Sequence, residues 1–147
     1  MKPTAFSKHI LRDYENHFQS EAIMKYKNIL QIDDDYDDCS FFLEALEEVS
    51  AATYTAIHNP VQALQQLISS EIHPDIIFLD INMPIMNGME FLTEIKKKDQ
   101  IKNIPVIIFS TSISGDAKKK LQDLGAMDYY IKPNDFSTLK NLLRNLI

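Results

Sequence analysis

The amino-acid sequence predicts an α/β domain in which a doubly wound, five-stranded parallel sheet carries helices on both faces. From Lys27 onward, short apolar runs alternate with segments whose apolar residues repeat at helical spacing. Strict strand-helix alternation is typical of parallel sheets, because parallel strands need right-handed crossovers and helices supply them. The runs at 75–79 and 105–109 are apolar at nearly every position, as expected of strands covered on both faces.

The expected strands are short segments rich in Ile, Val, Phe and Tyr. Each is a handful of residues long, which suits a strand better than a helix. In chain order they are NILQI (28–32), TYTAI (53–57), DIIFL (75–79), PVIIF (105–109) and MDYYI (127–131).

The first two expected helices follow the first two strands. Apolar residues repeat every three or four positions from Cys39 to Val49 and again from Val61 to Ile68. Asn59 can cap the second of these helices, and Pro60 fits its first turn.

Three further helices complete the alternation. One follows Asn87-Gly88 and ends in the lysines at 96–98, whose charge suits a helix C-terminus. A short helix at 116–124 stops at Gly125, a good left-handed terminator. The last helix is expected from Asp135 to Leu146.

Composition excludes several classes of function. The net charge of −6 and the pI near 5.1 argue against a nucleic-acid surface, which would be basic. The single cysteine, Cys39, excludes an internal disulfide and is expected to be a small buried apolar group. The sequence has neither a secretory signal nor an apolar run long enough to span a membrane, so we expect a cytoplasmic protein with no membrane insertion.

Residues 1–26 are expected to form an arm that precedes a domain at 27–147. Its residues Phe6, Ile10, Tyr14 and Phe18 recur every fourth position, which is consistent with an amphipathic helix. The sequence leaves open whether the arm docks on the domain, pairs with a second copy or hangs free. Met24 would itself be a normal start for the domain, so we hypothesise that the arm is dispensable.

Polar side chains follow four of the five expected strands. Because ligands of open α/β sheets bind outside the carboxyl ends of the strands, these residues are expected to meet in one site. The second strand is followed only by His58 and Asn59. The residues that follow the other four are Asp33, Asp34 and Asp35; Asp80; Ser110 and Thr111; Lys132 and Pro133.

These residue types suit phosphoryl transfer. The carboxylates of Asp33, Asp34 and Asp80 are hard oxygen ligands that select Mg²⁺ or Mn²⁺. Lys132 supplies one compact positive charge and Ser110 one hydroxyl, which suit two oxygens of a phosphoryl group. The acceptor can be a carboxylate, since aspartate is a known covalent phosphoryl carrier.

The sequence resembles the receiver domain of bacterial two-component response regulators over residues 27–147. The motifs that carry the resemblance lie on the expected elements in the right order, and DINMPIMNG also resembles free-standing receivers. These motifs are IDDD after the first strand, FLDINMPIMNG around the third, PVIIFSTS at the fourth and DYYIKP at the fifth. The family implies a flavodoxin-like sheet with strand order 2-1-3-4-5.

The resemblance also implies a role for individual residues. Asp80 would be the phosphoacceptor, and Asp33 and Asp34 would be the acidic pair that holds Mg²⁺. The hydroxyl of Ser110 would bond the phosphoryl group. Lys132 would be the family's site lysine. The family further implies that the backbone carbonyl of Asn82 is a metal ligand, that Tyr129 is a switch aromatic, and that the bond to Pro133 is cis.

Two features near these motifs need separate interpretation. Thr111 stands where the family usually has Ala or Gly, and its bulk is expected to narrow the approach to Asp80. The acids at 35, 37 and 38 are expected to cap the following helix. A calcium loop is the rival interpretation of this acidic run, but Asp38 stands where such a loop needs glycine.

We therefore expect a stand-alone receiver that is a switch rather than an enzyme. Asp80 would take its phosphoryl group from a sensor histidine kinase or a histidine phosphotransfer protein, and an unknown output protein would read the switched surface. Two alternatives remain: a Mg²⁺-dependent phosphohydrolase with Asp80 as nucleophile, and an interaction module that is never phosphorylated. Oligomeric state is not indicated by the sequence.

Overall fold

A computed structural model describes residues 25–147 and confirms the predicted α/β architecture. The five strands form one parallel sheet in the order β2-β1-β3-β4-β5. Their bounds are β1 Asn28–Ile32, β2 Thr53–Ile57, β3 Ile76–Leu79, β4 Val106–Ser110 and β5 Asp128–Ile131. The helix predicted over the arm lies outside the described residues.

The five predicted helices of the domain are also present. Asn59 caps α3 by accepting hydrogen bonds from the backbone of Val61 and Gln62, and Gly125 ends the segment after α5 with a positive φ of 95°. No helix among residues 25–147 has the length and apolar character needed to cross a bilayer. The helices are α2 Tyr36–Val49, α3 Pro60–Ile68, α4 Gly88–Lys96, α5 Gly115–Asp123 and α6 Phe136–Leu146.

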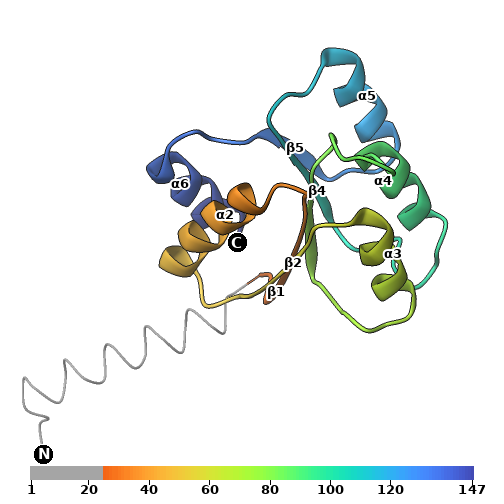
Figure 1. The fold of residues 1–147 in the computed structure, drawn as a ribbon, viewed down its shortest axis with the longest axis horizontal. Helices are drawn as coiled ribbons and strands as arrows, with labels where there is room; N and C mark the ends of the chain where they lie inside the picture. The colour runs from red at the N-terminus through yellow and green to blue at the C-terminus, as the bar shows by residue number, and fades with distance from the viewer. Residues whose placement is uncertain (1–24) are drawn as a thin grey trace, which may run out of the picture.

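The helices form two layers around the sheet. Helices α2 and α6 cover one face, and α3, α4 and α5 cover the other (Figure 1). This division follows from the pleat, because alternate residues of a strand point to opposite faces. In β1, Ile29 packs toward α2 and α6, whereas Leu30 and Ile32 pack toward α3 and α4.

The two cores differ in composition. An aromatic cluster lies beneath α2, where the ring of Phe42 contacts those of Phe78, Phe109 and Tyr54 at centroid distances of 5.0, 5.6 and 5.7 Å. The opposite core is mainly aliphatic and is built from β1, β3 and β4 against α3, α4 and α5. Burial on both faces explains why β3 and β4 are apolar at nearly every position.

One prediction about the backbone is wrong. The bond between Lys132 and Pro133 is trans, since no peptide bond between residues 25 and 147 is cis. The trans isomer is the intrinsically preferred form of an X-Pro bond, by about 0.5–1 kcal/mol.

Gly88 lets the start of α4 pack directly behind the end of β3. A Cβ atom at this position would lie 2.5 Å from the carbonyl oxygen of Asp80 and 2.8 Å from the Cα of Ile81. Both contacts are with backbone, which cannot rotate away as a side chain can. The absence of a side chain at Gly88 therefore helps to set the position of Asp80.

Replacing Gly88 with alanine should destabilise the fold by about 1–3 kcal/mol, the usual cost of overpacking. Gly115 provides a matched control, because it also begins a helix and a Cβ there would meet nothing within 4 Å. Urea unfolding should show a loss of stability for Gly88→Ala and little change for Gly115→Ala. Equal stabilities for the two variants would contradict this packing argument.

Candidate functional site

Three carboxylates meet at the carboxyl edge of the sheet. Strands β1 and β3 are neighbours in register, with Ile32 beside Leu79, so the residues that follow them, Asp33 and Asp80, lie side by side. The backbone N–H of Asp80 donates to the carbonyl of Ile32 at 3.0 Å and fixes this alignment. Asp33 and Asp80 are buried, Asp34 is exposed, and one oxygen from each lies within 4.8 Å of the others.

Lys132 brings an ammonium group to these acids from the end of β5. Its backbone N–H donates to the carbonyl of Ser110 at 2.8 Å, which continues the pairing of β4 and β5 past Ile131. The Nζ atom donates to Asp33 at 2.6 Å and to Asp38 at 2.7 Å, and lies 4.0 Å from Asp80. The lysine thus neutralises part of the acidic cluster.

Ser110 completes the set at the end of β4. Its buried hydroxyl donates a hydrogen bond of 2.7 Å to Oδ1 of Asp80. The side-chain amide of Asn82 donates in turn to the Ser110 oxygen at 3.4 Å. Asp80 is therefore held by a hydroxyl on one oxygen while its other oxygen faces Lys132.

Burial dominates the electrostatics of Asp33. Desolvation raises the pKa of Asp33 to about 6, although hydrogen bonds from Lys132 and from the backbone of Asp35 lower it. For Lys132, burial alone would lower the pKa, but hydrogen bonds to Asp33 and Asp38 and the negative charges of Asp33 and Asp80 outweigh burial and raise it. The site consequently holds a firmly protonated lysine beside a carboxyl that is costly to ionise without a further cation.

The loop from β1 to α2 fixes the backbone around the acids. Asp35 caps α2, as predicted, by accepting from the backbone N–H of Asp38 at 3.0 Å. His58 lies 3.0 Å through Nδ1 from the carbonyl of Asp33, and Tyr36 stacks on the His58 ring at 3.7 Å. The carbonyl can only accept, so this contact places a proton on Nδ1.

Sequence reasoning missed two of these residues. Asp38 was interpreted only as a helix-capping acid, and no role was expected for His58. No local pattern indicated His58, because its partner Asp33 is 25 positions away in the sequence. Asp38 carried a stronger signal, since an acid within the first turn after the first strand can face back toward that strand's end.

The remaining predicted residues lie around the rim of the site. Tyr129, in β5, is half-buried, and Nζ of Lys118 lies 5.2 Å from its ring centroid. Thr111 is exposed directly after Ser110. Cys39 is buried as expected, and burial together with the charge of Asp33 keeps the pKa of its thiol high.

The donor set fits a hard divalent cation. The carboxylates of Asp33, Asp34 and Asp80 are oxygen ligands of the kind that Mg²⁺ and Mn²⁺ take. The exposure of Asp34 leaves the cluster open on one side, as required by a cation that keeps part of its water shell. Such a cation would also relieve the repulsion between Asp33 and Asp80.

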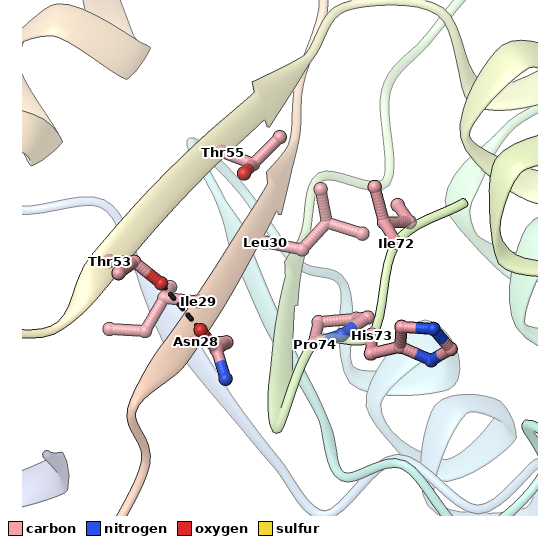
Figure 2. Close-up of a pocket in the computed structure, with 8 residues that line it drawn as sticks. All are labelled: Asn28, Ile29, Leu30, Thr53, Thr55, Ile72, His73 and Pro74. Atoms are coloured by element: carbon pink, nitrogen blue, oxygen red, sulfur yellow. Dashed lines mark hydrogen bonds between the residues drawn. The ribbon is translucent and has the colours of Figure 1, made fainter. Parts of the chain in front are cut away.

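A separate cavity of about 290 Å³ lies near the opposite end of the same strands (Figure 2). Thr53 and Asn28 line one side of it and share a 2.7 Å hydrogen bond, while His73 and Pro74 approach from the segment before β3. The described residues that line this cavity include no carboxylate and no lysine. The phosphoryl-transfer residue types are thus concentrated at the carboxyl edge.

Comparison with known families identifies the domain. A family model for the response regulator receiver domain matches residues 29–144. The chain belongs to this family. Receivers are signalling modules of two-component systems, so membership implies a histidine kinase partner.

Similar receivers occur in bacteria and plants. The chain is 34% identical over 110 residues to the two-component response regulator ORR8 of Oryza sativa, covering 75% of this chain and 89% of that protein. It is 30% identical over 145 residues to ARR5 of Arabidopsis thaliana, covering 92% and 78%. It is 32% identical to the transcriptional regulatory protein MalR of Bacillus subtilis, covering 79% of this chain but only 48% of MalR.

Solved receiver structures share the fold. The phosphorylated cyanobacterial phytochrome response regulator RcpA matches with a TM-score of 0.75 and 29% identity, covering 82% of this chain and 91% of RcpA. The Mn²⁺-bound form of the response regulator Rcp1 matches with a TM-score of 0.71 and 28% identity, covering 82% and 91%. The predicted strand order is confirmed by the sheet itself.

The burial of Asp33 makes a pH-dependent contribution to the stability of this receiver. Because its pKa rises from 3.8 to about 6 on folding, the folded state binds more protons between these values. Its contribution is most favourable below about pH 4 and falls as the pH rises through about 6. Without divalent cations, Asp33→Asn should therefore gain up to about 3 kcal/mol relative to the wild type between pH 4 and 7.

Urea unfolding of wild type and variant at about pH 4 and about pH 7, with a chelator present, measures this change in stability. Asp37→Asn is a suitable control, because Asp37 is exposed and the substitution removes the same charge. The interaction with Lys132 needs no separate correction, because the pKa of Asp33 in the folded state already includes the hydrogen bond from Lys132. A stability difference for Asp33→Asn that does not vary with pH would contradict the assignment.

Proposed function

We propose that the chain is a receiver in which Asp80 accepts a phosphoryl group in a Mg²⁺-dependent reaction. The observation that carries this proposal is the environment of the Asp80 carboxylate. It lies at the end of a central strand, with the Ser110 hydroxyl at 2.7 Å, the Lys132 ammonium at 4.0 Å and two further carboxylates around it. Phosphoryl transfer relies on such positioning and charge stabilisation.

The phosphoryl donor is a phosphohistidine on a sensor histidine kinase or on a histidine phosphotransfer protein. In the transfer, the P–N bond of the phosphohistidine breaks as a P–O bond forms to a carboxylate oxygen of Asp80, and the released imidazole takes up a proton. Lys132 and Ser110 stabilise the charge on the phosphoryl oxygens. Phosphorylation of RcpA, a similar receiver, supports this assignment by analogy.

Asp33, Asp34 and Asp80, together with the backbone carbonyl of Asn82, would hold the Mg²⁺ ion. Mn²⁺ would serve in its place, and the Mn²⁺-bound form of Rcp1 supports this choice by analogy. When bound, the cation supplies positive charge that offsets the negative charge of the acids and of the incoming phosphoryl group.

Phosphorylation then switches a partner-binding surface through Ser110 and Tyr129. Ser110 exchanges its hydrogen bond with Asp80 for one with the phosphoryl group, and Tyr129 turns inward. In the resting arrangement the Tyr129 ring lies against Lys118, so this turn breaks a cation–π contact and alters the surface of α5 and β5. An output protein reads that surface.

The proposal also covers how the chain is divided into segments, where the protein acts and which kind of partner it has. Residues 1–26 form an arm and 27–147 the receiver, in a cytoplasmic protein that acts through protein partners and not through nucleic acid. The acidic net charge of −6 supports the last point. The family match from residue 29 supports the boundary, and the arm is expected to be dispensable for phosphorylation.

A phosphohydrolase that uses Asp80 is the alternative of another class. Such an enzyme usually places a second aspartate two residues after its nucleophile as a general acid. Asn82 occupies this position, and its amide donates to Ser110. Because an amide cannot supply the proton, the receiver is the better account.

Incubation with a small phosphodonor and Mg²⁺ should add one phosphoryl group to the wild type. Intact mass measurement should detect this group, and mild base should remove it, as expected of an acyl phosphate. Asp80→Asn should remain unmodified, because its amide is not a nucleophile. The chelation of Mg²⁺ should abolish labelling of the wild type.

The same samples separate the alternatives. Rapid turnover of a chromogenic phosphate ester that is lost in Asp80→Asn would favour the phosphohydrolase. An unlabelled wild type would favour an interaction module that is never phosphorylated. Label retained in Asp80→Asn would exclude Asp80 as the acceptor.

A further inference from the structure

Asp38 reaches the site from helix α2 rather than from the end of a strand. It lies in the first turn of α2, and its carboxylate accepts a hydrogen bond of 2.7 Å from Nζ of Lys132. The two residues are 94 positions apart in the sequence. Asp38 is also outside the carboxylate cluster of Asp33, Asp34 and Asp80 that fits a cation.

The ammonium of Lys132 is engaged away from Asp80. Its distances to Asp33 and Asp38 are 2.6 and 2.7 Å, which are those of charge-assisted hydrogen bonds. The distance to Asp80 is 4.0 Å, which is too long for a hydrogen bond. In this arrangement Lys132 makes no hydrogen bond with Asp80, and two of its three N–H donors are committed to Asp33 and Asp38.

The pair formed by Lys132 and Asp38 is partly shielded from water. The Lys132 side chain is 9% exposed and the Asp38 side chain 34% exposed. Ion pairs with such partial burial are stronger than fully exposed pairs, which are often worth little. Breaking this contact thus has a real free-energy cost.

Asp38 differs from Asp33 in what a bound cation would do to it. Asp33 belongs to the set of acids that would hold a cation, so a bound ion would compete with Lys132 for its carboxylate. Asp38 would keep its carboxylate free for Lys132. Asp38 would therefore be the acid outside the cation-binding set that still competes for Lys132 when the site is filled.

We propose that Asp38 is a positioning residue that holds Lys132 back from Asp80. It thereby weakens the state in which Lys132 donates to a phosphoryl group on Asp80. The inference rests on the proposed function of Asp80. Removing the Asp38 carboxylate makes the resting position of Lys132 less favourable, and the site then binds a phosphoryl group or its mimic more tightly. Asp38 thus sets how readily the receiver is phosphorylated, although it does not contact the reacting atoms.

Asp37 provides a matched control for this residue. Both acids lie in the first turn of α2, so both have the same favourable interaction with the helix N-terminus. The side chain of Asp37 is exposed and makes no hydrogen bond or ion pair with any residue from 25 to 147. Asp37→Asn and Asp38→Asn remove the same charge, but only the second removes the contact with Lys132.

Binding of beryllofluoride, a phosphoryl mimic, tests the proposal in the presence of saturating Mg²⁺. The dissociation constant can be followed by amide chemical shifts around Asp80. Asp38→Asn should tighten binding about fivefold, as expected for the loss of about 1 kcal/mol from the resting state. Asp37→Asn should change it by less than about twofold, and Asp38→Ala should repeat the effect of Asp38→Asn.

Each other outcome overturns the inference. Unchanged or weaker binding by Asp38→Asn would mean that Asp38 does not hold Lys132 back. Equal tightening by Asp37→Asn would assign the effect to net charge alone. In a Lys132→Met background, Asp38→Asn should have no effect, and tightening that persists there would exclude action through the lysine.

Thermal melts of all variants confirm that each remains folded at the binding temperature. Binding of the mimic by the wild type distinguishes failure of the Asp38 inference from failure of the proposed function of Asp80. If it binds the mimic and the Asp38 variants match it, only the present inference fails. If it forms no adduct at Asp80, the proposed function and this inference fail together.

Discussion

The burial of two like charges side by side is the constraint on which the site depends. Asp33 and Asp80 follow neighbouring strands, so the sheet order forces their carboxylates together at a place where water is largely excluded. Neighbouring carboxylates oppose each other's ionisation, and burial adds to this cost. Lys132 and Ser110 offset part of it through short hydrogen bonds, and a cation among the three acids would offset more.

The rest of the domain keeps this costly arrangement in place. The strands that end at the site are packed on both faces, by an aromatic core beneath α2 and α6 and by an aliphatic core beneath α3, α4 and α5. Gly88 allows the backbone of α4 to press against that of Asp80. Functional groups at the ends of such packed strands are held more rigidly than groups on free loops. The resulting acceptor is fixed, whereas Lys132, on a long side chain, can change partners.

Much of the fold followed from local patterns. NILQI and TYTAI have the bounds expected of them, and the other three strands begin one residue later than predicted, with β4 also extending one residue further. Asn59 and Asp135 cap their helices because an oxygen three bonds from the backbone can reach the free N–H groups of a first turn. These are short-range effects, which a sequence pattern can carry. The cis isomer predicted for the bond to Pro133 was wrong. That prediction followed the family pattern, whereas X-Pro bonds have a small intrinsic preference for trans.

The sequence by itself determined the order of strands and helices along the chain and placed Asp33, Asp80, Ser110 and Lys132 at strand ends. That much is possible because apolar periodicity identifies the elements and parallel strands end at one edge. Only the tertiary structure decided that Lys132 donates to Asp33 and Asp38 rather than to Asp80. The choice depends on how α2 is rotated and how far it lies from β5. Those quantities are set by side-chain packing between distant segments, and no local pattern reports them.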